Sequence, residues 1–188
     1  VSSKSKYDKD NQKIVILKKQ SENWNIKLID TGEESNTAGR ILKIQDHVRD
    51  NFFLTYGDGL SNVNIKELNN LHKKNNKIVT LTAVQPSGRF GSLKISNKSK
   101  LVENFIEKPD GDGGWINGGF FVFNKKIFKF IKNDQSVLET DVLPLISEKK
   151  QLSAYKHNKF WYAMDTLNNK IYLQNLWNSN KAPWKIWK

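Results

Sequence analysis

The sequence predicts an α/β domain built on a mixed sheet, and three observations lead to this fold class. From Lys13 onward, short runs rich in β-branched and aromatic residues alternate with amphipathic runs of helical period. One apolar run, at residues 52–56, is continuous, as in the strands of parallel sheets that are buried on both faces. Between residues 52 and 84 the order is strand, helix, strand, which is the order of a βαβ unit.

The individual elements follow from the hydrophobic period and from turn and cap residues. Strands are expected at residues 13–18, 26–30, 52–56, 77–84, 90–95, 101–107, 115–123, 152–157 and 160–164. Helices are expected at residues 64–75, 125–131, 139–149 and 166–178, and another runs to about Val48 from a cap among Ser35, Asn36 and Thr37. No repeat or linker interrupts this order, so residues 1–188 are expected to form one domain.

Length and composition exclude several classes of protein. The chain has 188 residues, 37% of them hydrophobic, which suits one globular domain and not a disordered tail. No apolar run approaches the roughly 20 residues that a membrane-spanning helix needs. The lack of Cys in the sequence excludes disulfides, Cys-ligated zinc and thiol catalysis. The three histidines have no ligand partner at metal spacing, and we expect all of them on the surface.

The net charge of +12 comes mainly from lysine, since 28 of the 31 basic residues are Lys and 3 are Arg. Proteins that read DNA bases favour Arg, whose planar guanidinium bonds guanine at two points. We therefore interpret the charge as a solvated Lys surface, and we expect neither nucleic acid nor a membrane as a partner. An electrostatic nucleic-acid binder is the alternative, and it predicts an affinity that falls steeply with salt.

Two aspartates follow predicted strands and could hold a metal ion together. Asp58 comes after the buried strand, between Gly57 and Gly59, which would let a ligand approach the backbone; an ordinary turn is the alternative. Asp165 precedes a predicted helix, where an N-cap is the alternative role. Mg²⁺ takes one or two protein carboxylates and fills its other positions with water and substrate phosphates. Two aspartates at one sheet edge would meet that need.

Two further segments could contact a substrate. Glu107 and Lys108 stand before Pro109, which ends a predicted strand and leaves an acid and a base exposed for a sugar hydroxyl or phosphate; a surface ion pair is the alternative. Asn117 precedes two glycines inside an apolar strand. Paired glycines there indicate a bulge, a ligand against the backbone or the close packing of another strand.

Six short motifs occur in the order found in one enzyme family. They are TYGDG at residues 55–59, GRFG at 88–91, FIEKP at 105–109, GDGGWINGGFFV at 111–122, MDTL at 164–167, and LWNS with KAPWK within 176–185. In these motifs the chain resembles the sugar-phosphate nucleotidyltransferases, over nearly its whole length from about Trp24. GDGGWINGGFFV and KAPWK are similar to the motifs of glucose-1-phosphate cytidylyltransferases and set the chain apart from related uridylyl-, thymidylyl- and adenylyltransferases.

The resemblance implies a Rossmann-like nucleotidyltransferase fold of the GT-A-like type, a three-layer sandwich with a mixed, mainly parallel sheet. It implies that CMP passes from CTP to glucose 1-phosphate with Mg²⁺ as cofactor. The products would be pyrophosphate and CDP-glucose, a precursor of bacterial surface polysaccharide such as lipopolysaccharide O antigen. A related enzyme that uses UTP or dTTP is the alternative. We expect the enzyme to be a cytoplasmic homo-oligomer.

Site residues carry over by resemblance at the positions that match the motifs. Asp58 and Asp165 would be the Mg²⁺ ligands and, with Lys108, the catalytic residues. Glu107 and Lys108 would face the sugar phosphate, and Asn117 a glucose hydroxyl. The remaining expected substrate contacts are Ser35, Thr37 and Arg40, which fall in the family's nucleotide and subunit segment, and Gly57.

The resemblance has one gap. Family members open with a strand and the Gly-rich loop Gly-Gly-x-Gly-Thr-Arg-Leu, and this loop does not occur in the chain. The resemblance therefore implies an N-terminally incomplete domain that lacks roughly 60–80 residues, or two βα units. We expect the 188-residue chain alone not to catalyse the transfer, and an exposed sheet edge to favour self-association. A catalytically incomplete sugar-nucleotide-binding fragment is the alternative function.

Overall fold

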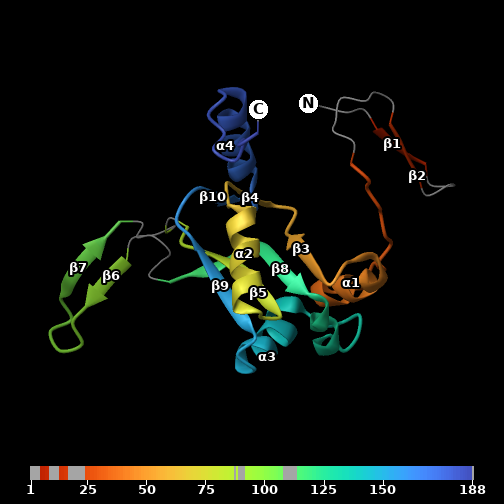
Figure 1. The fold of residues 1–188 in the computed structure, drawn as a ribbon. Coiled ribbons are helices and arrows are strands. Elements are labelled where there is room, and N and C mark those ends of the chain that lie inside the picture. The colour runs from red at the N-terminus through yellow and green to blue at the C-terminus, as the bar shows by residue number, and fades with distance from the viewer. Residues whose placement is uncertain are drawn as a thin grey trace.

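A computed structural model of the chain describes residues 5–8, 13–16, 24–86, 88, 92–107 and 114–187 (Figure 1). The described helices are α1 (Thr37–Lys43), α2 (Ile65–Asn75), α3 (Leu143–Glu148) and α4 (Leu167–Asn178), with the short 3₁₀ segments η1 (Gln45–His47) and η3 (Lys125–Phe130) and the π-helical turn η4 (Leu138–Val142). The described strands are β1 (Ser5–Asp8), β2 (Lys13–Ile16), β3 (Asn51–Thr55), β4 (Gly59–Ser61), β5 (Val79–Val84), β6 (Ser92–Ile95), β7 (Val102–Ile106), β8 (Ile116–Asn124), β9 (Leu152–His157) and β10 (Trp161–Ala163).

The central sheet has the strand order β3-β8-β5-β9 among the described residues. β8 runs antiparallel to both β3 and β5, whereas β5 runs parallel to β9. β3, β5 and β9 therefore point the same way, and their carboxyl ends lie at the top of the sheet in Figure 1. The mixed sheet is confirmed, with one parallel and two antiparallel pairings among its described strands. Ligands of open α/β sheets bind outside the carboxyl ends of the strands.

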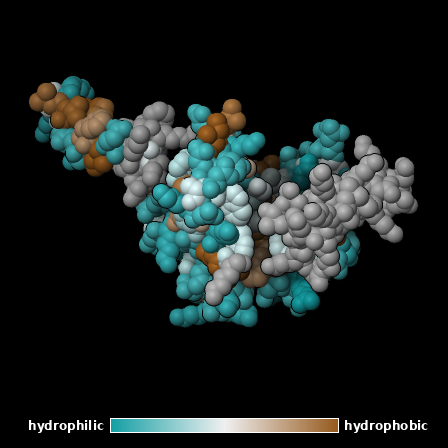
Figure 2. Space-filling model, turned by 90° about the horizontal axis from the view of Figure 1, so that it is seen from above, coloured by the Kyte–Doolittle hydropathy of each residue, from teal (hydrophilic) through white to brown (hydrophobic). Residues whose placement is uncertain are grey.

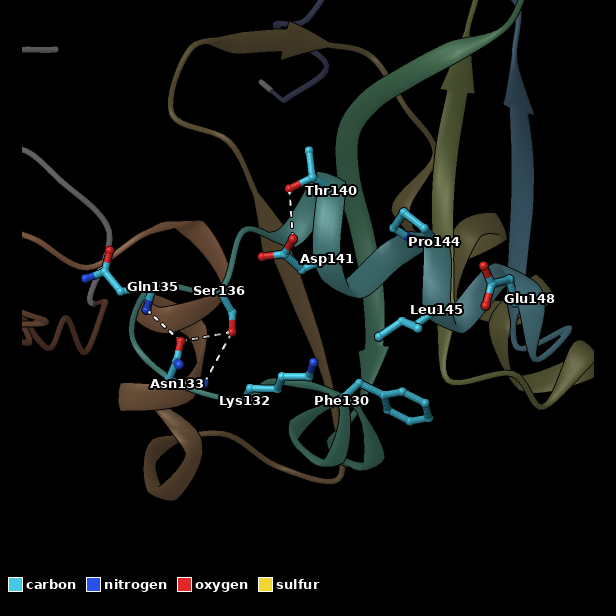
Figure 3. Close-up of a pocket in the computed structure, with 10 residues that line it drawn as sticks. All are labelled: Phe130, Lys132, Asn133, Gln135, Ser136, Thr140, Asp141, Pro144, Leu145 and Glu148. Carbon is cyan, nitrogen blue, oxygen red and sulfur yellow. Dashed lines mark hydrogen bonds between the residues drawn. The ribbon is translucent and has the colours of Figure 1, made fainter.

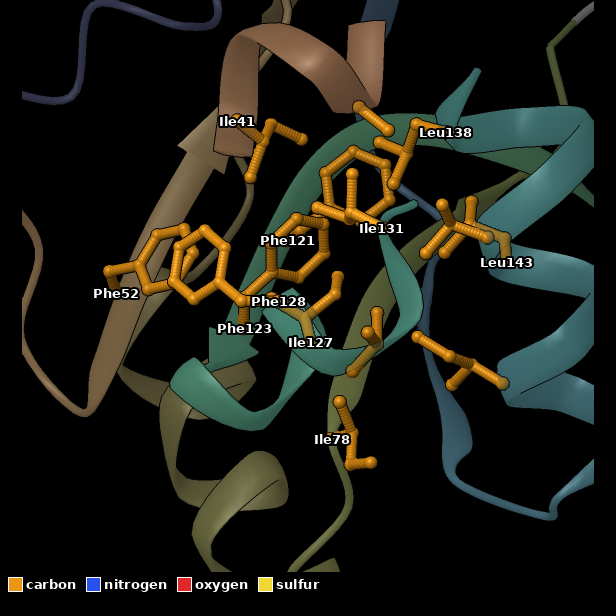
Figure 4. Packing of buried hydrophobic residues seen from close by; sticks show 14 residues of the cluster. Ile41, Phe52, Ile78, Phe121, Phe123, Ile127, Phe128, Ile131, Leu138 and Leu143 are labelled. Atoms are coloured by element: carbon orange, nitrogen blue, oxygen red, sulfur yellow. The ribbon is translucent and has the colours of Figure 1, made fainter. Parts of the chain in front are cut away.

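Helical segments cover both faces of this sheet. α2 lies across one face (Figure 1), where Leu68 is fully buried. α1, η3, η4 and α3 contribute to the core on the other face (Figure 4), which consists of Ala38, Ile41, Phe52, Ile78, Val79, Phe121, Phe123, Ile127, Phe128, Ile131, Leu138, Val142, Leu143 and Ile146. Burying one phenylalanine side chain contributes about 1.5–3 kcal/mol. The sandwich thus has the three layers that the family resemblance implies.

A small antiparallel ribbon of β4 and β10 lies above the carboxyl ends of the central strands, with α4 beyond it (Figure 1). The ribbon pairs Gly59 with Ala163 and Ser61 with Trp161. The buried ring of His157 lies 3.2 Å from the Ser61 hydroxyl, which donates to the carbonyl of Phe160 over 2.8 Å. These contacts tie the ribbon to the end of β9.

The hairpin of β6 and β7 projects from the opposite side of the sheet to α1 (Figure 1), and its two strands contact chiefly each other. Every residue of both strands is exposed. Leu93 pairs with Phe105 across the hairpin, and both side chains are more than half exposed. Figure 2 shows hydrophobic side chains at this end of the molecule. The hairpin therefore presents an apolar surface to solvent.

Several predicted elements differ from the structure. The strand expected at residues 26–30 does not form, because Ile26 and Leu28 are exposed and no described strand pairs with them. The first helix ends at Lys43 and continues only as η1. The segment at 125–131 is 3₁₀, and the one at 139–149 opens one residue earlier with a π turn.

The expectation that all three histidines lie on the surface is wrong for two of them. His72 and His157 are 3% and 4% exposed, whereas His47 is exposed. His72 lies on the inner face of α2, where its Nδ1 is 2.9 Å from the hydroxyl of Thr80. A histidine can be buried when both ring nitrogens find polar partners, and an isolated sequence position does not reveal those partners.

Candidate active site

The β4–β10 ribbon brings the two predicted metal ligands to one place. Asp58 immediately precedes β4, and Asp165 follows β10 after one intervening residue, Met164. The main-chain amide of Met164 donates to the carbonyl oxygen of Asp58 over 2.8 Å. Both aspartate side chains are exposed at the carboxyl end of the sheet. The sequence expectation that the two residues share one sheet edge therefore agrees with the fold.

The alternative role of Asp165, as an N-cap, is wrong. The N-cap of α4 is Thr166, whose hydroxyl accepts from the amide of Asn169 over 3.2 Å. The Asn169 side chain returns to the Thr166 amide over 3.0 Å, completing a capping box. The Thr166 hydroxyl and the Asn169 side chain together accept from main-chain amides at the start of α4. The cap therefore does not require the carboxylate of Asp165.

The donor set suits a hard divalent cation. Asp58 and Asp165 offer carboxylate oxygens, and Mg²⁺ usually takes one or two protein carboxylates with substrate phosphates and water. Among the described residues, no group of three or more His, Cys, Asp or Glu could hold a metal ion by itself. A metal at this place would therefore draw its other ligands from substrate. Gly57 leaves the adjoining space open, since a Cβ there would meet nothing within 4 Å.

Asn117 and its two glycines form a bulge in β8. Opposite β5, the register shifts between Leu81 and Ala83, so that Ala83 pairs with Asn117. Gly119 has φ +74°, and a Cβ on it would lie 2.7 Å from Cδ2 of Tyr56. The indole of Trp161 donates to the carbonyl of Gly118 over 2.7 Å. Of the three interpretations of the paired glycines, the structure shows the bulge and the close packing of neighbouring groups.

A chain of hydrogen bonds links Asn117 to the start of α1. The amide nitrogen of Asn117 donates to the hydroxyl of Tyr56 over 3.2 Å, and that hydroxyl donates to Oε1 of Glu139. Oε2 of Glu139 accepts from the hydroxyl of Thr37 over 3.0 Å. The hydroxyl of Thr37 in turn accepts from the amide of Leu138 over 2.8 Å. This network of hydrogen bonds joins β8, the end of β3, η4 and α1.

Burial and the hydrogen bond to Glu139 raise the pKa of Tyr56 well above its ordinary value. The negative charge of Asp58 also raises the Tyr56 pKa, whereas the hydrogen bond from Asn117 lowers it. The phenol is therefore neutral near pH 7 and keeps its proton for Glu139. Because Tyr56 stands two residues before Asp58, the network adjoins this aspartate.

Ser35 and Arg40 make contacts within the chain. The hydroxyl of Ser35, a buried residue, donates to the carbonyl of Thr31 over 2.5 Å. The guanidinium of Arg40 donates to the Thr31 hydroxyl and to the carbonyls of Gly32 and Glu33, over 2.7, 3.1 and 3.0 Å. In the structure these two residues therefore hold the turn before α1, and substrate contacts by Ser35 and Arg40 stay predictions.

Glu107 is not gathered with the aspartates. Glu107 directly follows β7 in the projecting hairpin, whereas Asp58 and Asp165 flank the ribbon above the sheet (Figure 1). Lys108 lies outside the described residues. The predicted sugar-phosphate contacts of both residues stay predictions.

A hollow of about 500 Å³ lies beside η4, lined by Phe130, Lys132, Asn133, Gln135, Ser136, Thr140, Asp141, Pro144, Leu145 and Glu148 (Figure 3). None of the predicted site residues lines it. Several of its polar groups bond to one another, as when Thr140 donates to Asp141 over 3.2 Å and Asp141 accepts from the amide of Val137 over 2.8 Å. We therefore place the candidate site at the aspartates and not in this hollow.

Sequence reasoning missed Tyr56 and Glu139 as members of the site. Tyr56 ends the apolar run of β3, where it reads as one more core residue, and Glu139 opens a predicted helix, where an acid is ordinary. The available signal was a hydroxyl at the end of a buried strand, directly before the Gly-Asp-Gly turn. Their partnership spans 83 residues, so no local pattern reveals it.

Among the described residues, no helix is long and apolar enough to span a bilayer.

Solved structures of related fold include HddC from Yersinia pseudotuberculosis, with a TM-score of 0.52 and 22% identity over 74% of this chain and 61% of that one. Another is UDP-glucose pyrophosphorylase in complex with UDP-glucose, with a TM-score of 0.56 and 15% identity over 81% of this chain and 65% of that one.

Relatives found by sequence have a higher identity to the chain than the solved structures do. The chain is 45% identical over 172 residues to glucose-1-phosphate cytidylyltransferase of Salmonella typhimurium, and 36% identical over 170 residues to the probable glucose-1-phosphate cytidylyltransferase of Bacillus subtilis. The matches span 90% and 89% of this chain and 66% of each relative. The nucleotidyl transferase family model matches residues 2–177. With its three-layer α/β fold and paired aspartates, the chain belongs to the nucleotidyl transferase family.

Proposed function

We propose that the protein acts in the transfer of CMP from CTP to glucose 1-phosphate, giving CDP-glucose and pyrophosphate. The observation that carries the proposal is the pairing of β4 with β10, which sets the backbones of Asp58 and Met164 side by side and so brings Asp165 to Asp58 at the carboxyl end of the sheet. The identity to two glucose-1-phosphate cytidylyltransferases supports CTP and glucose 1-phosphate as the substrates.

In the proposed reaction, a phosphate oxygen of glucose 1-phosphate bonds to the α-phosphorus of CTP while the bond from that phosphorus to the bridging oxygen of pyrophosphate breaks. Asp58 and Asp165 would hold Mg²⁺, which supplies positive charge against the phosphates. Asn117 would bind a glucose hydroxyl, and Glu107 and Lys108 would bind the sugar phosphate. Such catalysis rests on positioning and on electrostatic stabilisation, because the phosphoryl groups react directly with one another.

The projecting hairpin supports a homo-oligomer. A two-stranded hairpin is only marginally stable alone in water, and this one exposes Leu93 and Phe105 on its surface. Packing against another copy of the chain would cover these side chains and would add Glu107 to a neighbouring surface. A cytoplasmic location is part of the proposal, because CTP is made and used inside the cell.

The proposed activity is tested with radiolabelled CTP, glucose 1-phosphate and Mg²⁺, using the full-length protein, meaning this chain with any coding sequence that precedes Val1. We expect CDP-glucose, identified by mass spectrometry, and an equal amount of pyrophosphate. UTP and dTTP in place of CTP test base selectivity, and equal rates with either would contradict the assignment to CTP. Binding of CDP-glucose without turnover would favour the catalytically incomplete fragment.

A further inference from the structure

The hydroxyl of Tyr56 lies between an amide and a carboxylate, and the chemistry of the two partners fixes the direction of both hydrogen bonds. An ionised carboxylate only accepts, so the Tyr56 hydroxyl must donate its proton to Glu139. The phenol oxygen can then only accept from Asn117. The amide of Asn117 must therefore turn its nitrogen toward Tyr56, as it does over 3.2 Å.

The other end of the same amide is fixed as well. Oδ1 of Asn117 accepts from the main-chain amide of Gly119 over 3.0 Å, inside the β8 bulge. Turning the Asn117 amide over would face its NH₂ group to the N–H of Gly119 and would face Oδ1 to a hydroxyl that has no proton to give. Both hydrogen bonds would be lost together, so one orientation of the amide is strongly preferred.

We propose that Tyr56 and Glu139 are positioning residues that hold the Asn117 amide with one N–H free for a sugar hydroxyl. The inference rests on the proposed function, because it concerns how Asn117 meets the sugar. Asn117 has two N–H donors, and the contact with Tyr56 uses one of them. Within the part of the chain that the structure describes, no other group bonds to the second N–H or to the remaining lone pair of Oδ1. This N–H can therefore donate to a bound sugar hydroxyl.

Neighbouring groups hold the Tyr56–Glu139 pair in place. The main-chain amide of Tyr56 donates to the carbonyl of Gly119 over 3.0 Å, and its ring packs on Phe121 with the ring centroids 5.6 Å apart. Thr37 fixes the second carboxylate oxygen of Glu139. Removing only the hydroxyl of Tyr56 therefore leaves its ring and backbone packing unchanged, which makes Tyr56→Phe a clean test.

The chain offers a matched control. Tyr155 on β9 also donates to a glutamate, Glu67 of α2, over 2.6 Å, and neither residue is a partner of Asn117. Tyr155→Phe removes the same kind of hydrogen bond away from the network. Loss of the Tyr155–Glu67 hydrogen bond should lower the melting temperature without changing kcat or KM.

The kinetic test compares Tyr56→Phe, Glu139→Ala and Tyr155→Phe in the full-length protein. In Tyr56→Phe and Glu139→Ala we expect KM for glucose 1-phosphate to rise about three- to tenfold, the range for one hydrogen bond, with kcat within about twofold. When Asn117 is already replaced by Ala, Tyr56→Phe should raise KM no further, because the two residues act as one unit. An unchanged KM, or a fall in kcat alone, would overturn the inference.

A second measurement does not depend on activity. In the ¹⁵N-labelled full-length protein, the side-chain NH₂ signals of Asn117 report its hydrogen bonding directly. We expect them to move in Tyr56→Phe and to stay unchanged in Tyr155→Phe. Unmoved Asn117 signals in Tyr56→Phe overturn the inference even if the enzyme is active. Moved signals in a protein that forms no CDP-glucose support the positioning and reject the proposed function instead.

Discussion

The main-chain amide of Met164 donates to the carbonyl oxygen of Asp58 over 2.8 Å, although the two residues are far apart in the sequence. The bond extends the antiparallel ladder in which Gly59 pairs with Ala163. This bond fixes the backbone at Asp58 and next to Asp165. The two residues are therefore placed by strand pairing and not by the folding of a separate loop. A site built on paired backbone holds its ligands more accurately than one built on two free loops.

Removing either carboxylate charge should abolish metal-dependent activity in the full-length protein. Asp58→Asn and Asp165→Asn keep the size of the side chain but weaken its binding to a hard cation. We expect CDP-glucose formation to fall by at least about a hundredfold in each variant. The melting temperature should stay close to that of the wild type, since both side chains are exposed.

The control for this prediction is Asp46→Asn, which changes an exposed aspartate in η1. Its activity should equal that of the wild type. A wild-type rate in Asp58→Asn or Asp165→Asn would remove that residue from the metal site. An equal loss in Asp46→Asn would attribute the effect to net charge and not to ligation.

Gly119→Ala should destabilise the fold, because φ is +74° there and the new Cβ would lie 2.7 Å from Cδ2 of Tyr56. Backbone strain of this kind costs about 1–3 kcal/mol, and the clash adds to it. Gly57→Ala is the matched control, since its Cβ meets nothing within 4 Å. Urea unfolding monitored by tryptophan fluorescence measures both variants. Equal midpoints for Gly119→Ala and the wild type would contradict the bulge geometry.

The buried ring of His72 should make the free energy of unfolding depend on pH. Burial lowers the pKa of His72 below its ordinary value of 6.5, so the unfolded chain takes up a proton at a higher pH than the folded one. Stability from this residue is therefore fully present above about pH 6.5 and is lost as the pH falls toward the lower folded pKa, by up to about 1.4 kcal/mol per pH unit.

Urea unfolding between pH 5 and pH 8 tests this dependence. His72→Gln should remove the step, because glutamine does not titrate. His47→Gln should retain it, because His47 is exposed. A step of the same size in His72→Gln and the wild type would assign the pH dependence to other groups.

Local patterns predicted several elements close to their observed bounds. The strand β3, the amphipathic helix α2 and the strand β9 all form within two residues of expectation. The segment at 26–30 has the same local pattern, but a strand also needs a partner, and the sequence does not supply that information. The sequence offered Asp165 as the N-cap of the last helix, but the N-cap is Thr166, which forms reciprocal hydrogen bonds with Asn169.

The site was predicted less completely than the fold. Strand-end logic led to Asp58 and Asp165, since carboxyl ends of strands are a general place for ligands. The Tyr56–Glu139 contact arises only after η4 packs beside the end of β3. The spacing of residues along the chain does not predict that packing. The sequence does contain Gly119, whose missing side chain leaves room for the ring of Tyr56.

The apolar surface of the β6–β7 hairpin should control the oligomeric state. If Leu93 and Phe105 pack against another copy, Leu93→Lys combined with Phe105→Lys should shift the protein to smaller species in light scattering coupled to size-exclusion chromatography. Lys94→Ala is the control, because adjacent strand residues face opposite sides and Lys94 pairs with Glu103, its ammonium nitrogen 3.2 Å from the carboxylate. We expect Lys94→Ala to keep the wild-type mass. A wild-type protein that elutes as a monomer, or a double variant of unchanged mass, would show that this surface does not join copies of the chain.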